Sequence, residues 1–328
     1  MSLEKIANQM VESGKGILAA DESNPTCKKK FDSINLESNA LSRNQYRDML
    51  FNAPELENYI SGIILFDETF RQKDLSSNQL YPDFLSSKNI LPGIKVDLGL
   101  TYMDSAKLEQ QTRGLEDLYD RTSFYFSKGA KFSKWRSVFH ITNDLPSDQC
   151  IKKNSEDLAE YALICQSIGL VPIVEPEVLM DGNHSIQKSY EVTSKVLNLV
   201  FESLSSKSIN FEGMILKPNM VLSGYQCSSQ SSIEQVAELT LQCLKNNVPS
   251  SVPGIAFLSG GQSEDLATRH LNLMNLSTNP WKLTFSYGRA LQTSALNAWK
   301  GESRNIILGQ KAFLNRAKAN SLASQGLL

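Results

Sequence analysis

The stretch FEGMILKPNM, residues 211–220, places a lysine directly after an apolar run. Met214, Ile215 and Leu216 lead into Lys217, and Pro218 then prevents a strand or a helix from continuing. A charged side chain at the end of a strand is most often exposed, because an ammonium group is rarely buried without a partner. The alternative is an amine that is kept nucleophilic by the loss of water and by nearby charges. The rest of the chain decides between these two interpretations.

Other short apolar runs resemble this one in their length and in the polar group at their end. Together they predict eight strands, at 16–21, 61–67, 93–99, 130–139, 171–177, 211–218, 254–261 and 283–289. Segments with helical spacing separate them, such as SEDLAEYALICQSIGL, from its expected N-cap Ser155 to Gly169, and SIEQVAELTLQCLKNN, from Ser232. Strands that alternate with helices predict a parallel sheet, and eight of them predict an α/β fold, the closed (β/α)8 TIM barrel.

No linker rich in proline and glycine divides the 328 residues, so we expect a single domain over residues 1–328 with additional terminal helices. The last of these helices is expected at about 303–325, outside the barrel. An open doubly wound sheet is the structural alternative, since GKGILA (14–19) matches GxGxxA. However, these glycines precede their strand instead of joining a strand to a helix, which the dinucleotide-binding arrangement requires.

Charge and cysteine content argue against several classes of protein. The 33 basic and 35 acidic residues give a net charge of -2, so we expect no nucleic-acid partner. The five cysteines are widely spaced and never form CxxC, which is typical of reduced thiols in the cytoplasm. The first residues predict a short amphipathic helix rather than a signal peptide, and no apolar run approaches the length of a membrane span. The sequence therefore predicts a cytoplasmic protein without a membrane partner.

Nearly every predicted strand ends in a charged side chain or in a turn suited to phosphate. These groups are Asp21, Asp67, Lys95 with Asp97, Lys134 with Arg136, Glu175 with Glu177, Lys217, Ser259 with Gly260 and Gly261, and Ser286 with Gly288 and Arg289. Because side chains alternate along a strand, the members of each lysine–arginine or glutamate pair share one face. Each pair alone is typical of a solvated strand end. Since the carboxyl ends of barrel strands carry the active site, all of them together predict one site at the barrel mouth.

This set of groups predicts imine chemistry on a phosphorylated ketose. Neighbouring lysines make the charged form of an amine less favourable, and carboxylates beside it can carry protons. The glycine-rich turns after the last two strands, with Arg289, can bind a phosphate. A metal-dependent reaction would need grouped ligands, whereas His140, His184 and His270 lie on separate units without ligand spacing. We therefore expect no metal site.

Several motifs resemble the signatures of class I fructose-bisphosphate aldolases, in the family's order and spacing. They are GKGILAADES (14–23), KFSKWRSV (131–138), VPIVEPE (171–177), LKPNM (216–220), FLSGGQSE (257–264) and LTFSYGRALQ (283–292). The resemblance extends from about residue 5 to about residue 325. It implies a (β/α)8 barrel and a lyase of glycolysis and gluconeogenesis, which cleaves fructose 1,6-bisphosphate reversibly to dihydroxyacetone phosphate and glyceraldehyde 3-phosphate. It further implies a lysine Schiff base with no metal or other cofactor, and a homo-oligomer, often a tetramer.

The resemblance also implies roles for individual residues. Lys217 would form the imine, Glu175 would relay protons, and Asp21 would accept the proton of the C4 hydroxyl. Lys134 and Arg136 would line the site, and Glu177 would support the lysine network. The expected phosphate- and substrate-binding residues are Ser259, Gly260, Ser286, Gly288 and Arg289 beside the reacting ketone, and Ser23, Lys95 and Arg43 toward the other phosphate.

Three segments differ from the family pattern or carry no motif. Thr26 and Lys30 replace a serine and an arginine, and lysine lacks the bidentate geometry of arginine, which leaves open the preference between mono- and bisphosphates. The triple lysine at 28–30 is equally typical of a solvated helix face. Many members end in a tyrosine that assists enamine proton exchange, whereas this sequence ends in NSLASQGLL, so we expect another group or water to act. YQCSSQSSIEQ (225–235) predicts only a surface loop that leads to a helix.

Two other functions are alternatives to an aldolase. A transaldolase-type transferase would use the same barrel and an imine, but two phosphate-binding sets favour a bisphosphate substrate. A binding scaffold without catalysis would be expected to have lost part of its amine and acid set. The sequence instead retains Asp21, Lys134, Glu175 and Lys217.

Overall fold

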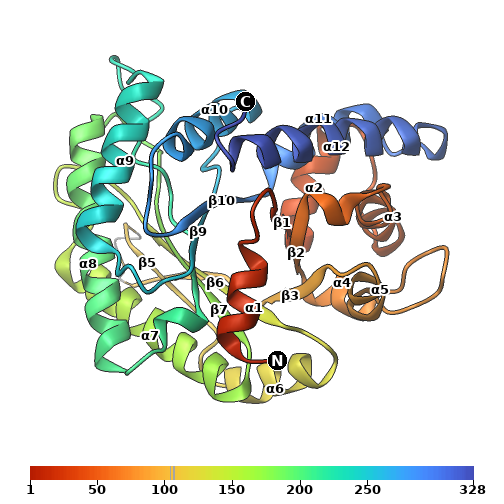
Figure 1. The fold of residues 1–328 in the computed structure, drawn as a ribbon, viewed down its shortest axis with the longest axis horizontal. Coiled ribbons are helices and arrows are strands. Elements are labelled where there is room, and N and C mark those ends of the chain that lie inside the picture. The colour runs from red at the N-terminus through yellow and green to blue at the C-terminus, as the bar shows by residue number, and fades with distance from the viewer. Residues whose placement is uncertain (104, 106–107) are drawn as a thin grey trace.

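The computed structural model describes residues 1–103, 105 and 108–328, and a closed barrel stands at its centre (Figure 1). Parallel strands form the barrel in the order β1-β10-β9-β8-β7-β6-β3-β2. Their bounds are β1 Gly16–Ala20, β2 Ile60–Leu65, β3 Leu91–Lys95, β6 Phe132–Phe139, β7 Val171–Val178, β8 Ile215–Leu216, β9 Gly254–Phe257 and β10 Lys282–Tyr287. A short antiparallel pair, β4 (Leu100–Tyr102) and β5 (Gln110–Thr112), lies outside it. The predicted (β/α)8 TIM barrel is confirmed.

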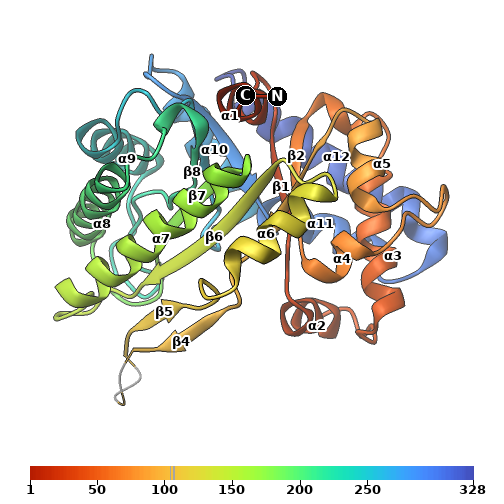
Figure 2. The ribbon, with the colours of Figure 1, turned by 90° about the horizontal axis from the view of Figure 1, so that it is seen from below.

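Helices surround the barrel and complete its alternation of strand and helix (Figures 1 and 2). Their bounds are α1 Leu3–Met10, α2 Asn24–Asp32, α3 Ala40–Phe51, α4 Asp67–Arg71, α5 Tyr81–Ser87, α6 Leu118–Ser127, α7 Asp148–Ile168, α8 Ile186–Ser206, α9 Ile233–Asn247, α10 Glu264–Asn275, α11 Arg289–Trp299 and α12 Ile306–Ala323. Figure 2 shows α1 and both chain ends at one end of the barrel, and α2 with the β4–β5 pair at the other. The two ends therefore differ in what covers them.

The helix before β7 is longer than the sequence predicted. Helix α7 begins at Asp148 with Ser147 as its N-cap, so the expected N-cap at Ser155 is wrong. The Ser147 hydroxyl accepts a hydrogen bond from the N–H of Cys150 at 3.1 Å, which provides a cap about two turns earlier. The expected end of this helix is confirmed, since Gly169 adopts a φ of 99° that suits glycine.

Each predicted strand differs from the observed one in at least one bound, and the differences are largest at three of them. The strand expected at 254–261 is only Gly254–Phe257. The strand expected at 211–218 is only Ile215–Leu216, because Phe211–Gly213 forms a 3-10 turn. The side chain of Asn210 caps this turn by accepting from the N–H of Glu212 at 3.1 Å. The strand expected at 93–99 is Leu91–Lys95, so this strand both begins and ends earlier than predicted.

Helix α1 closes the amino-terminal end of the barrel. Its buried Ile6 and Met10 belong to a cluster with apolar residues of the strand interiors, including Phe132. The Phe132 ring occupies the space in which a Cβ at Gly62 or Gly93 would lie, so these positions of β2 and β3 have to be glycine. This end of the barrel is packed with apolar side chains.

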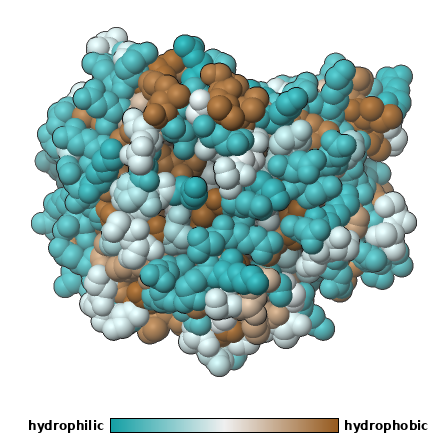
Figure 3. Space-filling model, in the orientation of Figure 1, coloured by the Kyte–Doolittle hydropathy of each residue, from teal (hydrophilic) through white to brown (hydrophobic). Residues whose placement is uncertain are grey.

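The surface is mainly hydrophilic on the face shown in Figure 3, with separate hydrophobic patches. Single exposed apolar residues such as Leu41 and Leu276 are common in globular proteins. Among the described residues, no helix has both the length and the apolar character that crossing a membrane requires.

The stability of the fold is expected to depend on the protonation of His270, a buried residue of α10. Its Nδ1 lies 2.6 Å from Oε1 of Gln262, so the neutral ring can donate this hydrogen bond. Burial lowers the pKa of His270 to about 4. Because the unfolded chain, with a pKa of about 6.5, binds this proton more readily, stability is highest above that pH and falls as the pH drops toward 4.

We expect the protonation of His270 to lower the unfolding free energy by about 2 kcal/mol when the pH falls from 7 to 5. Urea unfolding of the wild type and of His270→Gln at both pH values measures the difference. The His270→Gln variant should lose less stability over this interval, and His140→Gln should behave as the wild type. Equal pH responses of His270→Gln and the wild type would contradict the prediction.

Candidate active site

A cavity of about 960 Å³ opens at the carboxyl ends of the barrel strands. All of the residues with an expected role except Arg43 line it: Asp21, Ser23, Lys95, Lys134, Arg136, Glu175, Glu177, Lys217, Ser259, Gly260, Ser286, Gly288 and Arg289. Asp67 and Gly261, which the sequence also predicted at the barrel mouth, are not among its lining residues. The carboxylate of Asp67 instead accepts from Nε of Arg71 at 2.8 Å and from the hydroxyl of Tyr125 at 2.6 Å. The fold thus gathers into one space side chains that are widely separated in the chain.

Four of these side chains form a row of alternating charge, called here the charge row: Lys217, Glu175, Lys134 and Asp21. Lys217 directly follows β8, is only 3% exposed, and its Nζ lies 3.1 Å from Oε1 of Glu175 on β7. Oε2 of Glu175 lies 3.2 Å from Nζ of Lys134 on β6, and this Nζ lies 2.8 Å from Oδ2 of Asp21 after β1. Every charge in the row therefore has an opposite charge beside it, which buried ions require.

The pairing of the barrel strands determines where the side chains of the charge row lie. The N–H of Lys217 donates to the carbonyl of Val174 at 2.8 Å, which continues the pairing of β8 with β7 past the end of β8. On the other side of β7, Glu175 pairs in register with Arg136 of β6. Lys217, Glu175 and Lys134 thus come from the adjacent strands β8, β7 and β6, so the barrel backbone fixes their separation. Asp21 follows β1, which is not a neighbour of these strands, and reaches Lys134 across the barrel mouth.

The charges of the row stabilise one another's ionised forms. Burial alone would raise the pKa of Asp21, but the ammonium groups of Lys134 and Lys217 hold this pKa well below its ordinary value. Burial also opposes the charge of Lys134, and the carboxylates of Asp21 and Glu175 outweigh this effect and raise the pKa of Lys134. At neutral pH Asp21 is a carboxylate and Lys134 an ammonium.

Two further ion pairs flank the row. Lys95 at the end of β3 bonds the carboxylate of Asp97, whose other oxygen lies 3.9 Å from Nζ of Lys134. Nε of Arg136 bonds the carboxylate of Glu177. Burial opposes the charge of Arg136, but Glu177 and Glu175 raise its pKa, so the guanidinium stays charged.

The turns after β9 and β10 present backbone groups and a free cation to the cavity. Gly260 and Gly261 have φ values of 57° and 86°, which favour glycine, and the carbonyl of Ser259 accepts from the N–H of Gln262 at 3.0 Å. Gly288 is the N-cap of α11, and Arg289 is exposed without a carboxylate partner among the described residues. These groups suit an anion such as phosphate.

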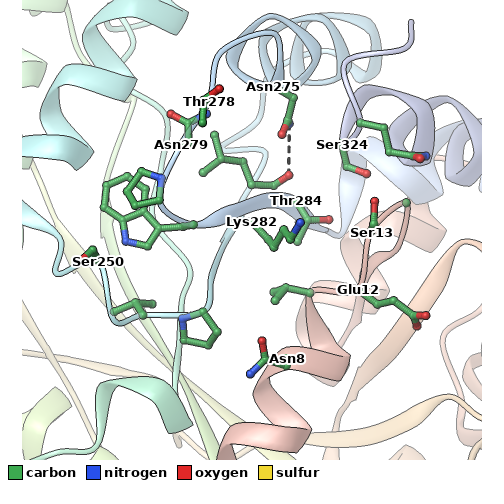
Figure 4. A pocket seen from close by; sticks show the side chains of 18 of the residues that line it. Asn8, Glu12, Ser13, Ser250, Asn275, Thr278, Asn279, Lys282, Thr284 and Ser324 are labelled. Carbon is green, nitrogen blue, oxygen red and sulfur yellow. Dashed lines mark hydrogen bonds between the residues drawn. The ribbon is translucent and has the colours of Figure 1, made fainter.

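A second cavity, of about 900 Å³, lies at the amino-terminal end of β10 (Figure 4). It is lined mainly by uncharged polar side chains, such as Asn275, which donates to the carbonyl of Leu283 at 3.2 Å. None of the predicted site residues lines it. Within the part of the chain that the structure describes, no group of three or more His, Cys, Asp or Glu side chains is arranged to hold a metal ion.

Comparison with known proteins identifies the family of this site. The model of the glycolytic family "Fructose-bisphosphate aldolase class-I" matches residues 2–328. The chain belongs to the class I fructose-bisphosphate aldolase family. Its activity is accordingly that of a lyase, and the family predicted from the sequence motifs is confirmed.

Similar aldolases occur in distant organisms. A probable class 1 fructose-bisphosphate aldolase of Xanthomonas axonopodis is 47% identical over 99% of both chains. A chloroplastic fructose-bisphosphate aldolase of Arabidopsis thaliana is 48% identical over 99% of this chain and 81% of its own. The solved structure of the Plasmodium falciparum aldolase, in complex with TRAP and an inhibitor, superposes with a TM-score of 0.97 at 47% identity, over 99% of this chain and 94% of the other.

In this class I aldolase Arg43 does not line the cavity. It is a buried residue of α3 whose Nε and Nη2 bond the two carboxylate oxygens of Glu68, at 2.7 and 2.6 Å. The ion pair occupies the guanidinium edge that a phosphate would need. The predicted contact of Arg43 with the substrate therefore has no support in this geometry and requires the pair to open.

The structure adds aldolase site residues that the sequence did not single out. Glu22 lines the cavity and bonds both Lys30 and Arg47. Gln292 of α11 accepts from Lys30 at 3.1 Å and donates to the carbonyl of Ala19 at 2.6 Å. Lys30 is therefore held at the cavity wall instead of lying on a solvated helix face. Glu22 and Gln292 could have been found from the motifs GKGILAADES and LTFSYGRALQ, which contain them, whereas Arg47 lies outside the quoted motifs.

Proposed function

We propose that Lys217 is the amine that forms the Schiff base with the C2 ketone of fructose 1,6-bisphosphate. The observation that carries this proposal is the buried Nζ of Lys217, held 3.1 Å from Glu175 at the end of β8. Loss of the ketone oxygen as water gives a protonated imine, which accepts the electron pair of the C3–C4 bond when that bond breaks. Glyceraldehyde 3-phosphate leaves first. Protonation of the enamine and hydrolysis then release dihydroxyacetone phosphate.

The other members of the charge row would move protons and hold charge during these steps. Glu175 touches both ammonium groups, so it can pass a proton to and from the reacting oxygen at C2. Asp21, a carboxylate at neutral pH, would accept the proton of the C4 hydroxyl as the bond breaks. Lys134, a permanent cation here, would hold both carboxylates in place. Arg136 and Glu177 would support the row from the neighbouring positions of β6 and β7.

Two sets of groups would bind the two phosphates. Ser259, Gly260, Ser286, Gly288 and Arg289 surround one part of the cavity and would bind the phosphate next to the ketone. Ser23, Lys95 and Lys30 line another part and would bind the distal phosphate. Because Lys30 already bonds Glu22 and Gln292, we expect its ammonium group to divide its hydrogen bonds between that phosphate and these two side chains. A bisphosphate ketose fits both sets.

We further propose that the chain acts as one catalytic unit over residues 1–328, without a metal or other cofactor, and that it assembles as a homo-oligomer. Imine chemistry supplies its own electron-accepting group, so it needs no metal ion to stabilise the enamine. The cytoplasmic location stays a prediction of the sequence, since the Arabidopsis relative is described as chloroplastic.

Borohydride reduction in the presence of fructose 1,6-bisphosphate tests the proposed mechanism. Intact-mass and peptide analysis should find one stable adduct, on the peptide that contains Lys217, and EDTA should leave turnover unchanged. An adduct on Lys134 or Lys95 instead would reassign the nucleophile. Turnover that is lost with EDTA, without any adduct, would refute the imine mechanism.

A further inference from the structure

The loop after β8 is bonded to the loop after β7, next to the proposed phosphate site. The N–H of Tyr225 donates to the carbonyl of Met180, and that of Gly224 to the carbonyl of His184, both at 2.9 Å. The sulfur of Met180 in turn lies against Gly260, 2.9 Å from the position of a Cβ there. The segment YQCSSQSSIEQ thus does more than lead to α9, because its first residue is fixed against the turn after β9.

The hydroxyl of Tyr225 reaches over this turn. It donates a hydrogen bond to the carbonyl of Gly260, and it fills the space in which a Cβ of Gly261 would lie. On the same side, such a Cβ would lie 3.1 Å from both Nη atoms of Arg289. Gly261 is therefore enclosed by a phenol and a guanidinium group, and a side chain at this position is excluded.

This arrangement matters for the N–H groups of the turn. Within the described part of the chain, the bonded N–H groups here are those of Leu258, to the carbonyl of Pro218 at 3.1 Å, and of Gln262, to Ser259. Those of Gly260 and Gly261 donate to no acceptor among the residues that the structure describes. A peptide unit between glycines rotates easily. Its free N–H group therefore keeps a fixed direction toward an anion only if another group holds the carbonyl of the same peptide unit. The Tyr225 hydroxyl holds the carbonyl of Gly260, whose peptide plane includes the N–H of Gly261.

We propose that Tyr225 is a positioning residue of the phosphate site. By bonding the carbonyl of Gly260 and lying over Gly261, it holds the turn in the conformation that directs free N–H groups toward the phosphate bound by Arg289. The proposal rests on the proposed function for the identity of the anion. It concerns only the phosphate next to the ketone, because Tyr225, in the loop after β8, contacts the loop after β7 and the turn after β9.

The test compares phosphorylated and unphosphorylated ligands with Tyr225→Phe, which removes only the hydroxyl. The dissociation constant of inorganic phosphate should rise about fivefold, the effect of one hydrogen bond of ordinary strength. The half-saturating concentration of dihydroxyacetone phosphate in borohydride trapping should rise by the same factor. That of dihydroxyacetone, which has no phosphate, should not change. The kcat for fructose 1,6-bisphosphate should stay within about twofold, because the contact is the same before and during bond cleavage.

Tyr190→Phe is the matched control. The Tyr190 hydroxyl likewise takes part in one hydrogen bond, as the acceptor from Asn246 at 3.1 Å, but Tyr190 lies on α8 and does not line the cavity. It should leave all four measurements unchanged. Unaltered phosphate binding in Tyr225→Phe, or an equal loss for dihydroxyacetone and its phosphate, would overturn the proposal. A wild type that traps no ketone would refute the Schiff base of Lys217 instead, and the phosphate titration would still decide the role of Tyr225.

Discussion

Lys217→Met is expected to lower the kcat for fructose 1,6-bisphosphate cleavage by at least about 10⁴-fold, which corresponds to about 5.5 kcal/mol. Methionine fills the same space but cannot form an imine, so the electron pair of the breaking bond has no acceptor. The other buried amine, Lys134, is kept charged by Asp21 and Glu175 and cannot replace it. Turnover assays and borohydride trapping measure the effect, and both signals should disappear.

Stability separates this result from misfolding. Removing the Lys217 ammonium leaves Glu175 paired with Lys134, so the unfolding free energy should change little. Lys207→Met, at a surface ion pair with Glu160, is the control and should keep full activity. A folded Lys217→Met protein that keeps more than about 1% of wild-type kcat would show that the nucleophile lies elsewhere.

Glu175→Gln is expected to lower kcat by about 10³-fold, within the usual range for a lost proton carrier. It is also expected to lower the unfolding free energy by about 3 kcal/mol, because it leaves the Lys217 and Lys134 ammonium groups facing each other without their shared carboxylate. Steady-state kinetics and urea unfolding measure the two effects.

Two variants make this prediction specific. Glu177→Gln, two residues along β7, leaves Arg136 unpaired, but this side chain is about a third exposed and water screens its charge, so the cost should be smaller. The double variant Glu175→Gln with Lys217→Met removes the surplus charge and leaves Lys134 paired with Asp21, so it should recover most of the stability, but not the activity. If Glu175→Gln were no more harmful than Glu177→Gln, the bridging role of Glu175 would be wrong.

Much of this architecture was predictable because strands and their ends leave local patterns. Apolar runs of strand length with polar ends predicted the closed barrel and the grouping of Lys134, Glu175 and Lys217 at one end. A barrel forces the carboxyl ends of its strands together, so a position on a strand predicts a position in the site. The roles assigned to these residues remain predictions for the experiments above.

What the sequence could not determine are contacts between segments that are distant in the chain and carry no repeating pattern. The ion pair of Arg43 with Glu68, the hydrogen bond of Lys30 to Gln292 and that of Tyr225 to the carbonyl of Gly260 belong to this group. Each depends on where a loop or helix face lies after the barrel has closed. The sequence by itself determined the barrel and the chemistry at its mouth, because both follow from local periodicity. Only the tertiary structure decided which charges are already paired and which groups remain free for a phosphate, because pairing depends on distances of a few ångströms between separate elements.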